Sequence, residues 1–416
     1  MRWNTYAIVI AAALVCRFAL GVAADVLNLR ALRPELPDEL RGVSDADRHR
    51  RAQEYTRART RFELVPESVH LVALFAFWLA GGFARLDDAV RGLGLAPVPS
   101  GLAYVGTLAL GAALLGLPFR WWSTFVVEER FGFNRTTART FWTDVAKGAV
   151  LAVLLGGPFL ATILWLLARA GSYAWLWAWL AVTLFTVGVQ LLAPTWILPL
   201  FNRFTPLDPG PLRDAIVAYA RAVRFPLDDV FLIDGSRRST KANAFFTGFG
   251  RRKRIALFDT LVERLPQAEL VAVLAHEVGH WRRWHVFQGL ALAIAQMGLV
   301  LFLFSMLLHQ PGLFEAFGVR QPSVYAGLVF LGFLLVPLDV ALSIGVRAIS
   351  RHHEREADAF AIETTGDGAP LATALARLSA DSLANPTPHP LYVLVHHSHP
   401  PVVERIRALR TGTTPG

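Results

Sequence analysis

The sequence predicts a mainly α-helical, polytopic membrane protein with a small α/β segment beside the membrane. Of its 416 residues, 54% are hydrophobic, and the mean hydropathy is +0.41. This composition is too apolar for an ordinary soluble protein. Apolar runs that are long enough to cross a bilayer recur along the chain, and arginine is concentrated in alternate connections between them. Together these observations predict helices that pass back and forth through a membrane.

Seven segments have the length and composition of membrane-spanning helices. They are residues 5–23, 67–84, 101–119, 149–168, 174–193, 286–308 and 324–346. The first segment also has features of a signal peptide, because Arg2 precedes the apolar run and small residues follow it. The apolar run continues through Leu27, which is long for a signal peptide. We therefore expect a retained first helix.

Basic residues alternate between the two sides of this arrangement. Residues 26–66 carry nine arginines and 120–148 carry four arginines and one lysine, whereas 169–173 and 309–323 carry one arginine each. Because cytoplasmic loops are rich in Lys and Arg, this alternation predicts an external N-terminus and places residues 194–285 and the C-terminal tail in the cytoplasm. The net charge of +9 is thus explained by topology in a lipid bilayer, and we expect no nucleic-acid partner.

The region after the fifth span contains the one sizeable segment outside the membrane. Five prolines mark its start, at positions 194, 199, 206, 209 and 211. Hydrophobic periodicity then predicts a helix over 211–223, strands over 230–234, 243–249 and 255–258, and a helix from about 266. The chain is accordingly divided into 1–200 with five spans, 201–284 outside the membrane, 285–348 with two spans, and 349–416 as a C-terminal segment.

The second of these helices carries the most informative motif, His-Glu-Val-Gly-His at residues 276–280. Two imidazoles four residues apart on a helix can hold one zinc ion from one face, and Glu277 between them can reach a metal-bound water. The preceding residues 268–275 are good helix formers without Gly or Pro, so the required helical register is expected. The spacing predicts one Zn²⁺ per chain, bound by His276 and His280.

A catalytic zinc usually has three protein ligands and a water, so a third ligand is expected downstream. Glu354 is the best candidate, and Asp358 shares its helical face and can orient a ligand imidazole through the free N–H. His352 and His353 are possible ligands by chemistry, but they do not share a face with Asp358. The alternative for Glu354 and Asp358 is an ordinary charged helix surface. Because two spans separate His280 from Glu354, the site would join the helix before the sixth span to the helix after the seventh.

Six stretches of the chain resemble the type I CAAX prenyl endoproteases, a family of integral-membrane zinc metalloproteases. They are residues 124–134, 243–249, 254–261, 276–281, 350–361, and 397–401 with 404–405, in the family's order and over nearly the whole chain. The resemblance implies that His276, His280 and Glu354 are the zinc ligands. It also implies that Glu277 is the general base and that Asp358 orients a ligand.

By the same resemblance, Asn243 begins an exposed strand edge to which an extended substrate adds, and His399 and Arg405 contact the substrate and the transition state. The alternatives are a plain antiparallel strand pair in the first case, and a capping turn followed by a surface arginine in the second. The family also implies that the seven helices enclose a water-filled chamber. Arg17 and Asp339, which lie inside spans and are costly against lipid, fit such a chamber.

We therefore expect a zinc-dependent membrane endopeptidase that cleaves near the C-terminus of a prenylated, CAAX-type peptide or another membrane-associated peptide. One alternative is a membrane quality-control metalloprotease of the heat-shock type, and another is a transporter or channel with a structural zinc. We expect a monomer in a bacterial inner membrane or, in a eukaryote, in the endoplasmic reticulum membrane, with its catalytic side in the cytoplasm. The single cysteine, Cys16, excludes an intrachain disulfide.

Overall fold

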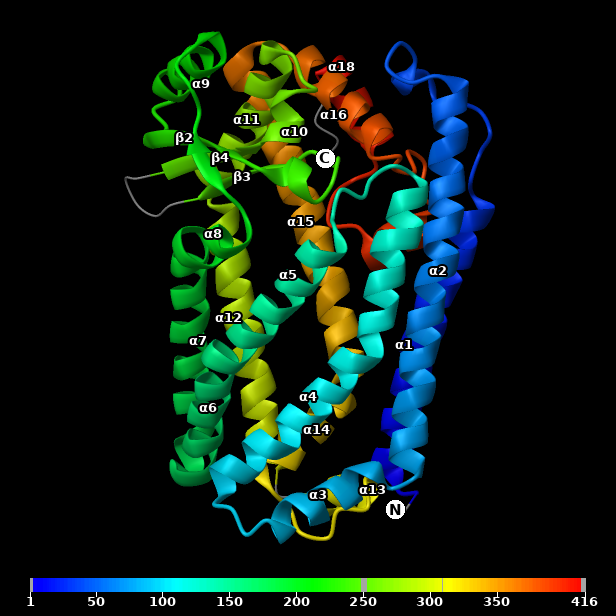
Figure 1. Ribbon diagram of the computed structural model, residues 1–416, viewed down its shortest axis with the longest axis vertical. Helices are drawn as coiled ribbons and strands as arrows, with labels where there is room; N and C mark the ends of the chain where they lie inside the picture. Colours follow the sequence, from blue (N-terminus) through cyan, green and yellow to red (C-terminus); the bar gives the residue numbers. More distant parts are fainter. Residues whose placement is uncertain (1–2, 248–252, 309, 413–416) are drawn as a thin grey trace.

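The computed structural model describes residues 3–247, 253–308 and 310–412. The protein is elongated, with long helices forming its body and a cap of shorter helices and a four-stranded sheet at one end (Figure 1). The described chain begins at the far end of the body and finishes at the cap. The fold is thus mainly helical with a small α/β part, as the sequence predicts.

Within the described residues, six helical segments are long and apolar enough to cross a bilayer. The simplest are α1 (Thr5–Arg30), α2 (Ala46–Leu79) and α12 (His285–Leu307). The other three contain π-helical turns, which let a helix continue with a local change of direction. They are α4 (Pro97–Trp122) with η2 (Ser123–Glu128), α5 (Ala138–Leu151) with η3 (Ala152–Gly156) and α6 (Gly157–Arg169), and α7 (Ala174–Leu192) with η5 (Ala193–Ile197) and α8 (Leu198–Phe201).

A bent pair of helices supplies the last crossing. α14 (Val324–Leu334) and α15 (Val336–Thr365) meet at an angle of 58°. The bend follows from Pro337, which has no N–H to bond back into α14 and whose ring crowds the preceding turn. Counted as one span, this pair brings the total to as many as seven, the number that the sequence predicts. α15 continues from the body into the cap (Figure 1), so a membrane helix carries residues directly into the site.

The helices differ in extent from the apolar runs that identify them. α2 begins at Ala46, so much of the arginine-rich region before residue 67 is helical. The predicted end of that span at residue 84 was wrong, because α2 stops at Leu79 and Gly81 adopts a left-handed conformation with φ of +73°. A non-glycine side chain is disfavoured there. The chain restarts as α3 (Gly82–Gly92) at the end of the body opposite the cap.

The cap sheet has the strand order β1-β2-β4-β3. Its strands are β1 (Phe204–Pro206), β2 (Leu227–Ile233), β3 (Ala244–Thr247) and β4 (Lys253–Phe258). The central pair β2 and β4 is parallel, and the other two pairs are antiparallel, which leaves β3 at an edge. The three predicted strands were confirmed, although residues 248–249 of the second lie outside the described residues. β1 was not predicted, because three residues ending in proline give no strand signal.

The central helix of the cap is α11 (Gln267–Arg282), which confirms the helix predicted from about residue 266. Its apolar face packs with the sheet, with α15 and with α9 (Pro211–Ala222), the helix predicted over 211–223. The shared core includes Leu274, Ala275 and Val278 of α11, Ile255 and Leu257 of β4, and Phe360 and Ala361 of α15. Three short helices, α10 (Asp259–Val262), α16 (Ala369–Asp381) and α18 (Val402–Thr411), complete the cap, and α17 (Pro390–His396) packs against α1 and α15.

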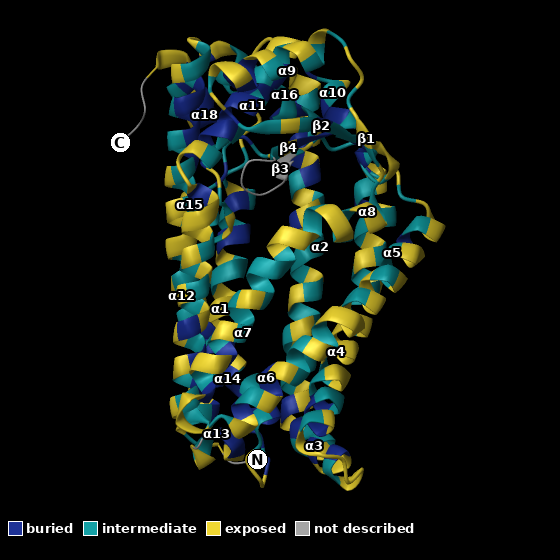
Figure 2. Cartoon of the chain, turned by 90° about the vertical axis from the view of Figure 1, so that its left-hand side faces the viewer, coloured by how far each residue is buried: buried dark blue, intermediate teal, exposed yellow. Residues whose placement is uncertain are grey.

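Burial is concentrated at the two ends of the molecule. Figure 2 shows buried residues in the cap and near the opposite end, where α3, α14 and α13 (Pro311–Ala316) lie, whereas the long helices between them are mostly intermediate or exposed. Apolar side chains such as Val153 and Leu184 are 70% and 64% exposed, as expected of surfaces that face lipid. A cavity of about 480 Å³ between α1, α2 and α15 is lined by Arg17 and Asp339, together with Glu67, His70 and Arg347.

Candidate metal centre and active site

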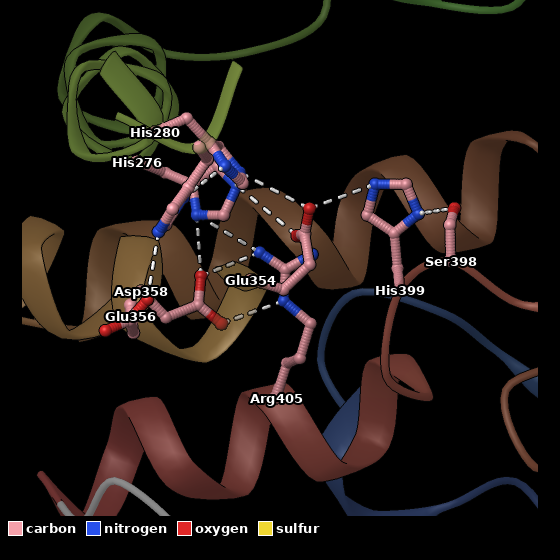
Figure 3. A network of polar contacts seen from close by, with 9 residues as sticks. His276, His280, Glu354, Glu356, Asp358, Ser398, His399 and Arg405 are labelled. Carbon is pink, nitrogen blue, oxygen red and sulfur yellow. Dashed lines mark hydrogen bonds and ion pairs between the residues drawn. The ribbon is translucent and has the colours of Figure 1, made fainter. Parts of the chain in front are cut away.

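The site forms where α11 crosses α15. Gly279 lies at the point of closest approach, because a Cβ placed there would be 3.0 Å from Cα and 3.1 Å from the carbonyl oxygen of Ala357. A residue without a side chain therefore lets the two helix backbones come together. This contact places the imidazoles of His276 and His280 directly against the Glu354 carboxylate of α15 (Figure 3).

The three predicted ligands lie at the mutual distances that zinc requires. The Nε2 atoms of His276 and His280 are 3.2 Å apart, and they are 3.4 and 3.3 Å, respectively, from the two carboxylate oxygens of Glu354. In a tetrahedral zinc site with bonds of about 2.0–2.1 Å, neighbouring ligand atoms lie about 3.3–3.4 Å apart. The donor set of two imidazoles and one carboxylate is also typical of a catalytic zinc with an open position.

The carboxylate of Glu354 gives a second reason to place a cation here. Its Oε2 atom is buried and has no hydrogen-bond partner. Arg405 Nη1 lies 3.0 Å away as an ion-pair partner, but without the direction that a hydrogen bond needs. Leaving a buried acceptor unsatisfied costs about 1–3 kcal/mol or more for a charged group. A metal ion at this position would satisfy that oxygen, so these residues fit the group.

Asp358 and Arg405 contact the predicted ligands from the side away from His399. His276 Nδ1 is 2.8 Å from Asp358 Oδ1, while Arg405 donates through Nε and Nη2 to the two oxygens of the same carboxylate, at 2.8 and 2.7 Å. Both side chains are more than nine-tenths buried. Arg405 comes from α18, at a separation of 47 residues from Asp358. The arginine that the resemblance assigns to substrate contact is thus mainly engaged with two carboxylates of α15.

His399 stands at the open side of the site. Its Nε2 atom is 3.2 Å from Glu354 Oε1, yet its side chain is 61% exposed. It lines a cavity of about 560 Å³ with Arg405, His397 and Pro400. Figure 3 shows His399 approaching Glu354 from the side, with Ser398 next to it. The cavity adjoins the ligand cluster, because His399 and Arg405 both contact Glu354.

The surroundings shift the pKa values of two titratable groups of α11, Glu277 and His276. Burial raises the pKa of Glu277, and the neighbouring Glu354 adds to the rise, while the positive charges of His276 and Arg405 oppose it. For His276 in the metal-free site, burial lowers the pKa, but the nearby carboxylates of Asp358 and Glu354 outweigh burial and raise it to about 9. A metal that binds here must therefore displace a proton from His276.

Asn243 lies at the start of the edge strand β3. Its carbonyl accepts a hydrogen bond of 3.0 Å from the Phe258 amide, and its Oδ1 accepts one of 2.9 Å from the amide of Ala244. Ala242, its neighbour, lines the same cavity as His399. The structure thus brings the beginning of an edge strand next to the cavity that His399 lines.

Several polar contacts near the site were not predicted from the sequence. Lys241 donates hydrogen bonds to the Glu128 carboxylate and the Tyr55 hydroxyl, which fixes the segment before β3 to α2 and η2. On the other side of the site, His285 and Glu356 form a pair beside His280. His285 and Glu356 lie within a few residues of the predicted ligands, which marks them as neighbours of the site, but the contact of His285 with His280 depends on the turn at Trp284, which the sequence does not signal.

Fold and site together define a class, the polytopic membrane proteins whose cap carries a metallopeptidase site. Comparison of the chain with known protein families agrees with this class. Residues 25–203 match the family described as CAAX prenyl protease N-terminal, five membrane helices, and residues 206–413 match peptidase family M48. The chain therefore belongs to peptidase family M48, and it is a multi-pass membrane metalloendopeptidase.

Similar proteins cover nearly the whole chain. It is 35% identical to the CAAX prenyl protease 1 homolog of Arabidopsis thaliana, over 92% of this chain and 93% of the relative. It is 34% identical to CAAX prenyl protease 1 of Saccharomyces cerevisiae, over 92% and 89%. The crystal structure of S. mikatae Ste24p superposes with a TM-score of 0.92 at 30% identity, covering 98% of this chain and all of that one.

Proposed function

We propose that this protein is a zinc-dependent endopeptidase that cleaves near the C-terminus of prenylated, CAAX-type peptides at the cytoplasmic face of a membrane. The observation that carries the proposal is the similarity, over nine-tenths of the chain, to relatives named CAAX prenyl proteases. The cavity lined by His399 and Arg405 supports it, because it adjoins the ligand cluster and is large enough for several residues of an extended peptide.

In this proposal His276, His280 and Glu354 hold the zinc. The ion would supply Lewis-acid chemistry, activating a water molecule and polarising the scissile carbonyl. Glu277 takes the proton from that water as its oxygen bonds to the carbonyl carbon, and gives it to the peptide nitrogen as the C–N bond breaks. Burial raises the pKa of Glu277, which makes its carboxylate a stronger base than an ordinary glutamate when it takes the proton.

His399 and Arg405 have different parts in the proposed reaction. His399 is exposed to the cavity, so its ring can donate to the oxygen that develops negative charge. Arg405 is buried behind the ligands, where it fixes Glu354 and Asp358 and contributes positive charge to the site. We assign substrate alignment to Asn243 and the free edge of β3, which can pair with an extended backbone.

The proposed setting follows from the arginine distribution. The cap lies at the same end as the arginine-rich start of α2, which indicates the cytoplasmic side. We propose a monomer in a bacterial inner membrane or, in a eukaryote, in the endoplasmic reticulum membrane.

The proposal is tested with purified protein in detergent and three substrates. They are a farnesylated peptide ending in Cys-aliphatic-aliphatic-X, the same peptide without the lipid, and an unfolded soluble protein. We expect cleavage of the farnesylated peptide, removed by 1,10-phenanthroline and restored by added zinc. Intact farnesylated peptide together with degradation of the unfolded protein would make the quality-control activity the better assignment, and zinc binding without any cleavage would favour a structural metal.

A further inference from the structure

His285 and Glu356 lie beside the proposed metal centre without being its ligands. His285 is the first residue of α12 and follows Trp284, whose left-handed φ of +63° turns the chain between α11 and α12. This turn brings the His285 ring back against His280, with the two Nδ1 atoms 3.0 Å apart. On its other side, His285 Nε2 lies 2.9 Å from Glu356 Oε2 of α15. His285 is buried, whereas the side chain of Glu356 is partly exposed.

We propose that His285 and Glu356 are positioning residues that fix the tautomer and ring orientation of His280. The inference rests on the proposed metal site. An imidazole that offers Nε2 to a metal carries its proton on Nδ1, so His280 must donate from Nδ1. The acceptor in reach is His285 Nδ1, which therefore carries no proton. His285 then has its own proton on Nε2 and donates it to Glu356.

The contacts from His280 to His285 and from His285 to Glu356 explain how the second ligand imidazole is held. The first, His276, has a carboxylate of its own, Asp358, at 2.8 Å. Asp358 is already shared with Arg405 and belongs to the other side of the cluster. His280 instead reaches the Glu356 carboxylate through His285. Ligand imidazoles in metal sites usually have such a partner for the second ring nitrogen, and its loss lowers metal affinity by about 10–100-fold.

We assign these side chains to positioning and not to a second metal site. His285, His353 and Glu356 can bring three ligand atoms within 4.8 Å of one another. However, His353 Nε2 donates to Gln288 Oε1 at 2.9 Å, and His285 Nε2 donates to Glu356, so a metal would have to displace a proton and break a hydrogen bond at each nitrogen. The two rings are also stacked, with centroids 3.9 Å apart and planes within 7° of parallel. Two ligands of one ion would have to turn out of this stack.

The test measures metal retention in four purified variants. His285→Phe keeps an aromatic ring that can stack on His353 but removes both nitrogens, and Glu356→Ala removes the final acceptor. Glu356→Gln keeps an oxygen that can accept from His285. His352→Ala is the matched control, because His352 Nε2 lies 3.9 Å from Glu356, beyond hydrogen-bond distance, and its side chain is 64% exposed.

Zinc affinity is determined by competition with a chromophoric chelator, and the visible spectrum of the cobalt-substituted protein reports ligand geometry. We expect His285→Phe to lose about 10–100-fold in zinc affinity and to change the cobalt spectrum. Glu356→Ala should lower zinc affinity by a smaller factor than His285→Phe. Glu356→Gln should have a zinc affinity close to that of wild type, and His352→Ala should match wild type. Circular dichroism and gel filtration confirm that each variant is folded.

Two results would overturn the inference. One is wild-type zinc affinity and an unchanged cobalt spectrum in folded His285→Phe. The other is a second equivalent of zinc in the wild type that disappears in His285→Phe while the first is unaffected. A His276→Ala variant separates this inference from the proposed site. If His276→Ala loses zinc and His285→Phe does not, only the positioning role fails, whereas normal zinc in His276→Ala removes the metal site itself.

Discussion

Three acidic residues at alternate positions of α15 have three different partners around the site. Glu354 faces the imidazoles of α11, and Asp358, one turn later, binds His276 and Arg405. Glu356, between them in sequence, contacts His285. Positions four apart share a helical face and positions two apart do not. One face of α15 therefore contacts the ligand cluster directly, through Glu354 and Asp358, and another face contacts it through Glu356 and His285.

At the level of single residues, Glu277→Gln should separate metal binding from turnover. The variant keeps all three proposed ligands but loses the group that carries the proton, so zinc content should equal that of wild type while peptide cleavage falls by at least about 100-fold. Zinc by atomic absorption and cleavage are measured on the same sample. Cleavage at a tenth of the wild-type rate or better would contradict the role of Glu277 as general base.

Glu354 and Asp358 should differ in how strongly they affect the metal. Glu354→Ala removes a proposed ligand and should abolish stoichiometric zinc. Asp358→Ala should lower zinc affinity by about 10–100-fold, because His276 loses its orienting partner. Asp358→Asn, which keeps one acceptor oxygen, should lie between Asp358→Ala and wild type in a chelator competition. Normal zinc in Glu354→Ala, with loss in His353→Ala, would show that the third ligand is His353.

The metal-free protein should lose stability as the pH rises. The pKa of His276 is raised to about 9 in the folded, metal-free site, above its ordinary value of 6.5. Its stabilising contribution is therefore complete below pH 6.5 and is lost as the pH rises from about 6.5 to 9. Thermal unfolding of chelator-treated protein should show this loss, and His276→Gln should show less of it. Zinc-loaded protein should not show it, since the metal replaces the proton.

The sequence could indicate some of these residues and not others. The spacing of His276 and His280, and of Glu354 and Asp358, follows from helical periodicity alone. The bond between Arg405 and Asp358 joins segments 47 residues apart and depends on where α18 packs against α15, which no local pattern encodes. His285 was overlooked because its contact with His280 depends on the left-handed turn at Trp284, a conformation that the sequence does not signal.

At the level of elements, the crossing of α11 and α15 should tolerate no side chain at Gly279. A methyl group there would meet backbone atoms of Ala357 at 3.0 and 3.1 Å, and backbone cannot rotate away as a side chain can. We expect Gly279→Ala to destabilise the folded protein by about 1–3 kcal/mol. It should also weaken zinc binding, because two of the proposed ligands lie on α11 and the third lies on α15, and the substitution would push these helices apart. The measurement is thermal unfolding with and without zinc.

Gly289→Ala in α12 is the matched control for this prediction. No atom lies within 4 Å of the position a Cβ would take at Gly289. The same substitution should be neutral or slightly stabilising there, since alanine favours a helix by up to about 1 kcal/mol over glycine. Equal behaviour of the two variants would mean that the close crossing does not control the site.

Hydropathy and periodicity predicted most elements, but several boundaries depend on other interactions. The start of α2 at Ala46 is polar and is capped by Asp45, so its helix extends well before the apolar run. α7 continues past Pro194 through a π-helical turn to α8, although proline was interpreted as the exit from the span. The break between α14 and α15 was missed because the apolar run is continuous there, and only the position of Pro337 marks it.

At the scale of the whole molecule, the arginine-rich segment lies at the same end as the cap. The cap and the start of α2 share one end, and α3 with α13 forms the other. The cavity lined by Arg17 and Asp339 lies between α1, α2 and α15, where charged groups that are costly against lipid can contact water or one another. Sequence composition predicted polar residues inside the spans, but it could not say which helices would enclose them together.

Sidedness can be tested with single cysteines in a Cys16→Ala background. Ser236→Cys lies in an exposed turn of the cap, and Leu93→Cys lies just after α3 at the opposite end, where Leu93 is 64% exposed. Because arginine-rich connections remain in the cytoplasm, an impermeant thiol reagent added outside intact cells should label Leu93→Cys and not Ser236→Cys. Both should react after permeabilisation, which confirms that each thiol is accessible. Labelling of Ser236→Cys from outside would place the whole cap, and with it the proposed catalytic site, on the external face of the membrane.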